Sequence, residues 1–351
     1  MLSVRTVSAK SLEYFESAQP EPGIGEALIK VEHVTLCGTD LHIWEDDYTS
    51  ELPLVQGHEI AGTVVALGET VQGTDTTEVS VGERIVIDPL ISCGECRTCR
   101  RGRANVCPNL VVLGCYCDGG FAEYLSVSVD KLHRLPDGLP TELGPVAEPA
   151  AISLEAVTRG RAEAGDTVLV LGAGPIGLLS TLALHDLGAT VVTADTNPDR
   201  VEMATSMGSD HTLLINPGQP FPSRELSEMI GEEAPDGPDL VIEATGLPAS
   251  LENALRAVAP AGRVVQVGIS AHPTSFPLNL VPFKEIDLLG SRNSQGLMPE
   301  ALKLISRHVD TVRSLITHRF DVTDLDSAFR TLGDRTQRVG KVLIDMPRRT
   351  R

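Results

Sequence analysis

Cys37, Thr39 and His42 place a thiolate, a hydroxyl and an imidazole close together in the chain. These groups suit an alcohol held by a metal ion in a closed site, because its proton must leave through side chains. Cys37 would bind the metal, Thr39 would take the proton, and His42 would pass it to water. A lone cysteine is also a common small buried hydrophobe, so this interpretation depends on further ligands elsewhere in the sequence.

His58 and Glu59 are the next ligand candidates and lie directly before an apolar stretch. A neutral imidazole and a carboxylate are suitable zinc ligands beside a thiolate, and a catalytic zinc keeps one position open for substrate. The alternative is a surface pair at the start of a strand. Glu148 begins a predicted helix that runs through Ala156. It is either a further ligand, a carboxylate that supports the ligands, or a helix charge favoured by the dipole.

Four closely spaced cysteines form a separate pattern in a lobe of about residues 90–110. Four thiolates can close a tetrahedral shell around one zinc, and such a site is structural because it leaves no position for substrate. An iron–sulfur cluster and a zinc ribbon that contacts nucleic acid are the alternatives. Cys115 and Cys117 are expected to be spare thiols near this lobe. The four cysteines of the pattern are Cys93, Cys96, Cys99 and Cys107.

A buried strand over residues 166–171 runs into a glycine-rich turn and then an apolar helix to about Leu187. This order is typical of a dinucleotide-binding fingerprint, whose glycines let a pyrophosphate approach the helix N-terminus. A second strand, residues 190–194, ends at Asp195, whose carboxylate would accept hydrogen bonds from ribose hydroxyls and repel a 2′-phosphate. We therefore predict NAD rather than NADP. The fingerprint residues are Gly172, Gly174, Pro175, Ile176 and Gly177.

The alternation of strands and helices continues with strands at residues 239–242 and 263–267. This alternation predicts a doubly wound parallel sheet, in which ligands bind beyond the carboxyl ends of the strands. Thr245 and Gly268 follow two such ends and are therefore expected beside the cofactor. Arg200 either weakens the preference for NAD or is a solvated helix charge.

The first part of the chain predicts a β-rich, barrel-like domain, because short strands are separated by glycine turns. The pattern changes again after residue 290, and the C-terminal segment is expected to return to this first domain. The strands of the first part are expected at residues 26–32, 60–67 and 84–88.

The composition limits the classes of partner. A chain of 351 residues is long for one hydrophobic core, so two domains are expected. The formal net charge of −19 disfavours nucleic acid and anionic membranes, which attract clustered lysine and arginine. Residues 1–10 lack the features of a secretory signal, and seven cysteines then favour metal binding in a reducing cytoplasm over disulfides. We therefore expect a cytoplasmic protein that acts on a small molecule.

These motifs, in this order, make the chain resemble the zinc-containing medium-chain alcohol dehydrogenases over essentially its whole length. The resemblance implies an α/β chain with a GroES-like β-barrel catalytic domain, residues 1–151 and 290–351, and a Rossmann NAD-binding domain, residues 152–289. It implies an active site in the cleft between the domains, one catalytic and one structural zinc per chain, and a homo-oligomer, either a dimer or a tetramer. Glu148 would then be a fourth, exchangeable ligand of the catalytic zinc.

Two subfamily signals conflict within this resemblance. Residues 37–42 resemble threonine dehydrogenases, whereas Glu148-Pro149 and residues 158–160 resemble sorbitol and other polyol dehydrogenases. Glu155 stands where polyol members often carry a histidine. We expect NAD-linked oxidation of a secondary alcohol, with a polyol or sugar-derived alcohol favoured and oxidation of L-threonine as the alternative. The candidates for substrate contact are Trp44, Tyr48, Arg292 and Asn293.

Two alternatives do not involve this catalytic site. One is a zinc-ribbon regulator that senses NADH without catalysis, and the other is a reductase of the same fold that uses no zinc. The complete set of ligand candidates, from Cys37 to Glu59, disfavours both. Metal content separates the hypotheses, because the regulator would bind zinc only at the four-cysteine lobe.

Overall fold

A computed structural model describes residues 1–69, 79–334 and 336–347. The chain divides into two compact units, one formed by Met1–Glu148 and Met298–Arg351 and the other by Pro149–Leu297. The second boundary therefore falls at 297/298 instead of the expected 289/290. Residues 291–297 stay with the second unit because the Ser291 amide donates to the Gln266 carbonyl at 2.9 Å and the Gln295 amide to Glu155 at 3.3 Å.

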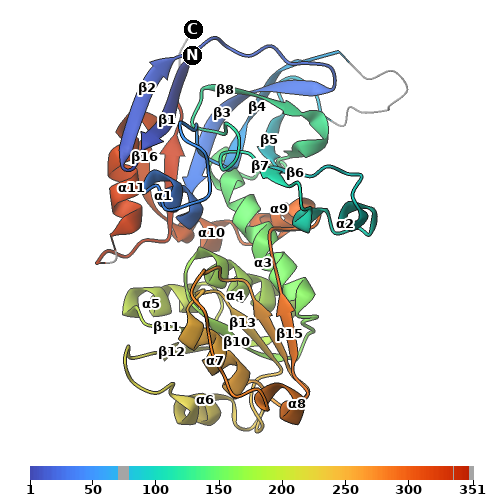
Figure 1. The fold of residues 1–351 in the computed structure, drawn as a ribbon, viewed down its shortest axis with the longest axis vertical. Helices are drawn as coiled ribbons and strands as arrows, with labels where there is room; N and C mark the ends of the chain where they lie inside the picture. The colour runs from blue at the N-terminus through green and yellow to red at the C-terminus, as the bar shows by residue number, and fades with distance from the viewer. Residues whose placement is uncertain (70–78, 335, 348–351) are drawn as a thin grey trace. The chain divides into compact units, whose positions relative to one another are not determined.

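The first unit is organised around a seven-stranded sheet in the order β16-β17-β3-β4-β5-β9, with β8 also paired to β3 (Figure 1). The long strand β3 is apolar and almost continuously buried, so it forms the centre of the sheet. It pairs antiparallel with β4, β8 and β17, and the β-rich character predicted for this part is confirmed. The strands are β3 (Glu26–Leu36), β4 (Glu59–Leu67), β5 (Arg84–Ile87), β8 (Tyr124–Ser128), β9 (Leu132–Arg134), β16 (Ile316–Asp321) and β17 (Lys341–Asp345).

Shorter elements complete the first unit. An N-terminal hairpin, which the sequence analysis missed, pairs β1 (Leu2–Ser8) with β2 (Ser11–Glu16). The strands β6 (Leu90–Ile91) and β7 (Val111–Val112) pair at the base of the four-cysteine lobe. The helices are α1 (Gly38–Trp44), α2 (Arg97–Arg100), α9 (Met298–Arg307), α10 (Val309–Leu315) and α11 (Leu325–Gly333), with 3-10 turns at Ala104–Val106, Val129–Lys131, Thr141–Val146 and Val322–Asp324. Helix α3 (Ala147–Arg159) begins at the end of this unit and continues into the second.

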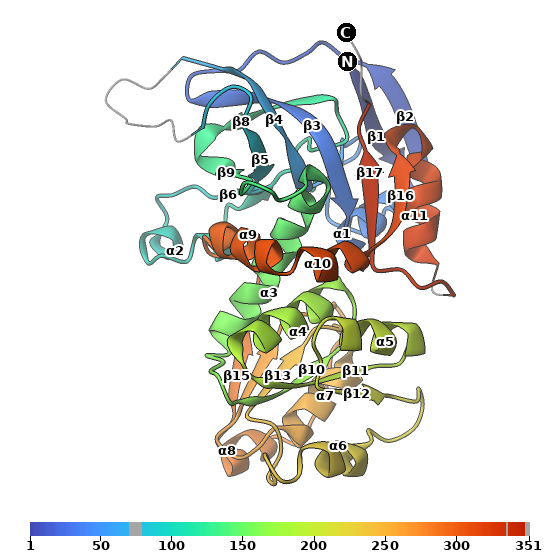
Figure 2. The same ribbon diagram turned by 180° about the vertical axis from the view of Figure 1, so that it is seen from behind.

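The second unit is a six-stranded parallel sheet in the order β12-β11-β10-β13-β14-β15, which confirms the predicted doubly wound arrangement. Helices cover both faces (Figure 2): α6 and α7 pack against one, and α4 and α5 lie on the other. The strands are β10 (Thr167–Leu171), β11 (Thr190–Asp195), β12 (His211–Leu214), β13 (Leu240–Glu243), β14 (Arg263–Gln266) and β15 (Asp287–Gly290). The helices are α4 (Pro175–Leu187), α5 (Pro198–Ser206), α6 (Ser223–Ile230), α7 (Pro248–Ala257) and α8 (Leu280–Lys284). No helix within the described ranges has the length and apolarity needed to cross a membrane.

Candidate active site

The antiparallel pairing of β3 with β4 brings the first ligand candidates together. Thr35 lies opposite Glu59 in this register, so Cys37, just beyond the end of β3, meets His58, just before the start of β4. The ligand atoms of Cys37, His58 and Glu59 all lie within 4.8 Å of one another. Residues 21 and 22 positions apart in the chain therefore form one cluster, as the sequence predicted.

Asp40, which the sequence analysis did not single out, holds both segments of this cluster. Its carboxylate is fully buried and accepts from the amides of Cys37, at 2.9 Å, and Gly57, at 3.3 Å. It also lies 3.5 Å from Nδ1 of His58. Burial alone would lower the pKa of His58, but the charge of Asp40 raises it well above the ordinary value. Because Nδ1 faces Asp40, Nε2 is the nitrogen left to bind a metal.

Glu59 is fully buried and makes two further contacts through its carboxylate. It accepts a hydrogen bond from the Thr35 hydroxyl, and Nζ of Lys341 lies 2.5 Å away. Lys341, at the start of β17, is 2% exposed and also donates to the Leu36 carbonyl at 2.9 Å. Burial would lower the pKa of Lys341, but the charge of Glu59 raises it. Oε2 contacts both Thr35 and Lys341, whereas Oε1 contacts Lys341 and keeps a lone pair that could bind a metal.

Glu148, at the start of α3, lies outside the group of ligand atoms within 4.8 Å of one another, but the charges of His58 and Glu59 act on it. Its Oε2 atom is buried and has no hydrogen-bond partner among the residues that the structure describes. Burial raises the pKa of Glu148 to about 7, the charge of His58 opposes this, and the charge of Glu59 adds to it. A buried carboxylate oxygen without a partner is costly unless a cation satisfies it. One thiolate, one imidazole and two carboxylates form a donor set that fits zinc.

Thr39 and His42 lie three residues apart on α1 and therefore share one face of the helix. The His42 side chain is 55% exposed, and its Nδ1 lies 2.9 Å from a carboxylate oxygen of Asp47. An exposed imidazole can exchange a proton with water, as the predicted relay requires.

The substrate candidates have different surroundings. Trp44 is 2% exposed and its ring stacks on Phe329 with centroids 5.2 Å apart, so its prediction as a substrate contact is wrong. Tyr48 lies beside Tyr116, with the two hydroxyl oxygens 3.4 Å apart. Arg292 and Asn293 lie in the loop after β15, where Asn293 adopts a left-handed backbone with φ of 51°.

Cys115 corrects another prediction. It is buried, and its sulfur lies 3.6 Å from Nδ1 of His58, so it belongs beside the candidate active site and not at the four-cysteine lobe. It also joins a small apolar cluster with Ile43 and Leu54, which the side chain of Tyr48 covers in part.

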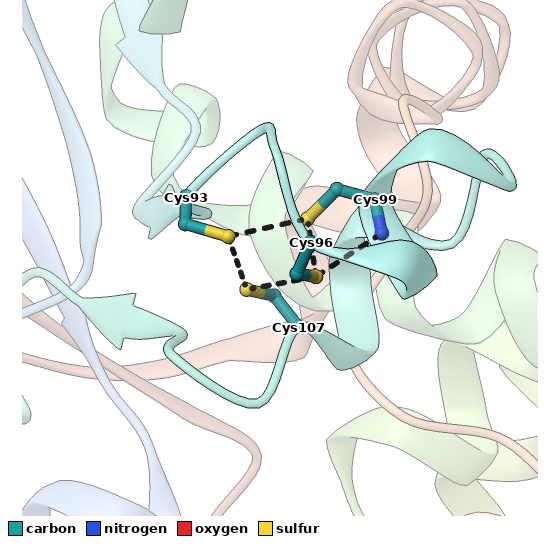
Figure 3. A group of neighbouring side chains, drawn as sticks. All are labelled: Cys93, Cys96, Cys99 and Cys107. Carbon is teal, nitrogen blue, oxygen red and sulfur yellow. Dashed lines mark hydrogen bonds between the residues drawn. The ribbon is translucent and has the colours of Figure 1, made fainter.

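The four-cysteine lobe forms a second, closed centre. Its sulfur atoms point toward one another (Figure 3), with sulfur–sulfur distances of 3.4 to 4.0 Å. A tetrahedral zinc with Zn–S bonds of about 2.3 Å separates its sulfurs by about 3.8 Å. Iron–sulfur clusters hold their thiolates much farther apart, so this geometry excludes that alternative. Hydrogen bonds from the amides of Cys96 and Glu95 lower the pKa of Cys93 to about 6, whereas burial and the neighbouring thiols raise the pKa of Cys99 to about 12. The lobe is a structural zinc site.

We expect Cys96→Ser to reduce stability without touching the ligand cluster around Cys37. A structural zinc contributes free energy to folding, so its loss should cost several kcal/mol. Thermal unfolding and zinc content measure this, with a fall from two zinc ions per chain to one. The partly buried Cys117→Ser is the matched control, and an unchanged melting temperature in Cys96→Ser would contradict a structural role.

The glycine-rich turn between β10 and α4 has the geometry of a pyrophosphate site. Gly172 has a φ of +99°, and a Cβ atom at Gly177 would lie 1.7 Å from the Gly172 carbonyl oxygen, so both positions require glycine. Asp195 ends β11, and its Oδ2 accepts from the Ala173 amide at 2.7 Å. The turn and the carboxylate thus lie together, as a dinucleotide requires.

The other predicted cofactor neighbours lie at the same edge of the sheet. The Thr245 amide donates to Glu243 at 2.8 Å, and a Cβ atom at Gly268 would lie 2.0 Å from the Gly246 nitrogen, so the loops after β13 and β14 touch. Arg200 lies in the first turn of α5, beside the Asn197 cap. The buried Glu155 accepts from the Gln295 amide and so ties α3 to the loop after β15.

Known protein families match both the first part of the chain, with the metal-ligand candidates, and the later part, with the glycine-rich turn. Residues 23–137 match the alcohol dehydrogenase GroES-like domain, and residues 175–307 match the zinc-binding dehydrogenase family. The chain is 33% identical to L-threonine 3-dehydrogenase of Pyrococcus abyssi over 97% of each chain. It is 32% identical to sorbitol dehydrogenase of Bacillus subtilis, over 88% of this chain and 87% of that one. The NADH complex of the RspB alcohol dehydrogenase of Escherichia coli CFT073 superposes with a TM-score of 0.88 at 32% identity, covering 98% and 99% of the two chains.

Proposed function

The chain belongs to the zinc-containing medium-chain alcohol dehydrogenases, and we propose that it oxidises a polyol or sugar-derived secondary alcohol with NAD. The family makes it an NAD-linked oxidoreductase that acts on CH–OH groups. The single observation that carries the proposal is the cluster of Cys37, His58 and Glu59 ligand atoms within 4.8 Å. A purely NADH-sensing regulator would have no use for this cluster.

Cys37, His58 and Glu59 would hold the catalytic zinc, and Glu148 would be an exchangeable further ligand. Zinc, when bound, acts as a Lewis acid toward the alcohol oxygen, and NAD accepts the hydride. Asp40 fixes the orientation of the His58 ring, and Lys341 holds the Glu59 carboxylate in place. The Thr39 hydroxyl would relay the proton, taking it from the alcohol while giving up its own, and His42 would take up the released proton and pass it to water.

Tyr48 packs against the apolar cluster that contains Cys115, whose sulfur lies 3.6 Å from His58, so its hydroxyl is a candidate contact for a hydroxylated substrate. Tyr48 and Tyr116 can donate to and accept from further hydroxyls of a polyol. L-Threonine, the alternative substrate, carries an ammonium and a carboxylate and would call for charged partners. Arg292 and Asn293 are the residues proposed to contact the polar end of the substrate. We expect the protein to form a dimer or tetramer in the cytoplasm.

Spectrophotometry of NADH formation tests the proposal. The purified protein is offered polyols, sugar acids, simple secondary alcohols and threonine, before and after chelation. We expect NADH from the polyol group, lost on chelation and restored by zinc. Turnover of threonine alone would select the alternative. No NADH formation with any of these substrates, together with one zinc per chain instead of two, would favour the regulator.

We expect Asp195→Ser to shift the coenzyme preference toward NADP. The carboxylate of Asp195 would repel a 2′-phosphate, and a like-charge contact of this kind costs several kcal/mol. The ratio of kcat/KM for NADP to that for NAD should therefore rise at least about tenfold. Asp199→Ser, a surface carboxylate in the first turn of α5, is the matched control. An unchanged ratio in Asp195→Ser would show that this carboxylate does not face the ribose.

A further inference from the structure

The structural zinc lobe carries a dense group of positive charges, which we call the arginine cluster: Arg97, Arg100, Arg101 and Arg103. No aspartate or glutamate occurs between Glu95 and Asp118, although the whole chain has 48 acidic residues and a net charge of −19. The lobe is therefore opposite in sign to the rest of the molecule. A local field of this kind attracts anions to one place on the surface.

The cluster is built on the rigid part of the lobe. The Arg100 amide donates to the Cys96 carbonyl at 3.0 Å, and the Arg103 amide donates to the Thr98 carbonyl at 3.1 Å. The backbone of the arginines is thus fixed to the same turns that carry the zinc thiolates. Binding would therefore order the arginine side chains but not their backbone.

A cavity of about 370 Å³ lies at the cluster and is lined by Arg97, Thr98, Arg101, Arg103 and Val106. Its volume falls in the range of about 300–1,000 Å³ that is usual for small-molecule sites. Among the described residues, the side chains of Arg97 and Arg101 form no hydrogen bond or ion pair with another residue. Both arginines are exposed to solvent, so the cavity is an open depression in the surface, and neither guanidinium group has a carboxylate among the described residues to neutralise it.

Neutralisation of the zinc thiolates is the simplest structural role for these arginines, but the contacts do not support it. The hydrogen bonds to the sulfurs come from the backbone: the Cys99 amide donates to Cys96 and the Asn109 amide to Cys107, both at 3.4 Å. Neither Arg97 nor Arg101 donates to a sulfur in the described part of the chain. Three arginines of the cluster, Arg97, Arg101 and Arg103, line the cavity instead.

We propose that this cavity binds a phosphorylated small molecule. The planar guanidinium groups of Arg97 and Arg101 match the oxygens of a phosphate bidentately, and the Thr98 hydroxyl can add a further donor. The site belongs to the zinc lobe and is separate from the ligands around Cys37, so the inference does not depend on the proposed oxidation.

Calorimetric titration of the zinc-replete full chain tests the site, with saturating NADH present to occupy the glycine-rich turn. The probes are fructose 1,6-bisphosphate and, as the uncharged control, fructose. We expect saturable binding of the bisphosphate only, weakened by added salt. The double variant Arg97→Gln/Arg101→Gln should bind it at least about tenfold more weakly. Arg224→Gln, which removes an exposed arginine of α6, should bind like the parent.

Zinc content and thermal stability of the double variant establish that the lobe is intact. Equal binding of bisphosphate by the parent and the double variant, with two zinc ions in each, would overturn the proposal. Absence of saturable binding to the parent at low ionic strength would overturn it as well. Salt-sensitive self-association in place of ligand binding would assign the cluster to the acidic surface of a second copy and contradict a small-molecule site.

Discussion

Cys37→Ser is expected to lower turnover by more than about 100-fold while NADH binding is unchanged. Loss of a residue that only supports a metal ligand lowers metal affinity or activity about 10- to 100-fold, so loss of a ligand itself should lower turnover further. Cys37 follows β3 directly and is held by the contact between its amide and Asp40, so serine can take its place without disturbing the backbone. A hydroxyl binds zinc far more weakly than a thiolate at neutral pH.

Three measurements separate this result from simple unfolding. Steady-state NADH formation gives the loss of turnover, elemental analysis gives zinc per chain, and NADH fluorescence titration reports the glycine-rich turn. We expect one zinc instead of two and an unchanged dissociation constant for NADH. Cys117→Ser, the replacement of a partly buried thiol outside the ligand cluster, should match the parent. Full turnover by Cys37→Ser with one zinc bound would remove Cys37 from the catalytic site.

The parts of this site that could be predicted are those whose residues lie within short segments of the chain. Cys37, His58 and Glu59 each stand beside a recognisable neighbour in the sequence, and their meeting requires only that β3 and β4 pair. The glycine-rich turn and Asp195 are equally local, because a parallel sheet places successive strand ends at one edge. Chemistry and topology together thus locate the ligands without knowledge of tertiary packing.

The parts that could not be predicted depend on contacts between distant segments. Lys341 meets Glu59 across 282 positions, and in the sequence it is only the first residue of a short strand. Trp44 has the residue type of a substrate contact, yet α1 turns it toward Phe329 and the core. Cys115 looks like a neighbour of the lobe in sequence, but its loop returns to His58. Burial, and not residue type, decides these roles.

The same distinction explains the secondary structure. Strands buried on both faces, such as β10 and β13, are apolar runs that the sequence shows plainly. The two edge strands are short and poorly buried: β12 buries only one residue, Leu213, and β15 buries none, and neither was among the expected strands. An edge strand has one neighbour and less need of apolar residues, so its pattern is weak.

Lys341→Met is expected to lower the free energy of unfolding by about 3–5 kcal/mol, because it leaves the fully buried Glu59 without its cation. Methionine nearly preserves the volume of the side chain, so the loss reflects charge and not a cavity. Denaturant unfolding of the zinc-depleted protein gives the value. Lys303→Met, at an exposed lysine of α9, is the matched control and should change stability by less than about 0.5 kcal/mol.

The double variant Glu59→Gln/Lys341→Met separates the two charges. If the cost lies in an uncompensated carboxylate, removing that carboxylate as well should restore most of the lost stability, so the double variant should be more stable than Lys341→Met alone. Zinc adds a second cation to the argument: if Glu59 is a ligand, zinc saturation should reduce the cost of Lys341→Met, because the metal then neutralises the carboxylate. Equal losses with and without zinc would instead leave Glu148, whose buried oxygen has no other partner among the described residues, as the carboxylate ligand.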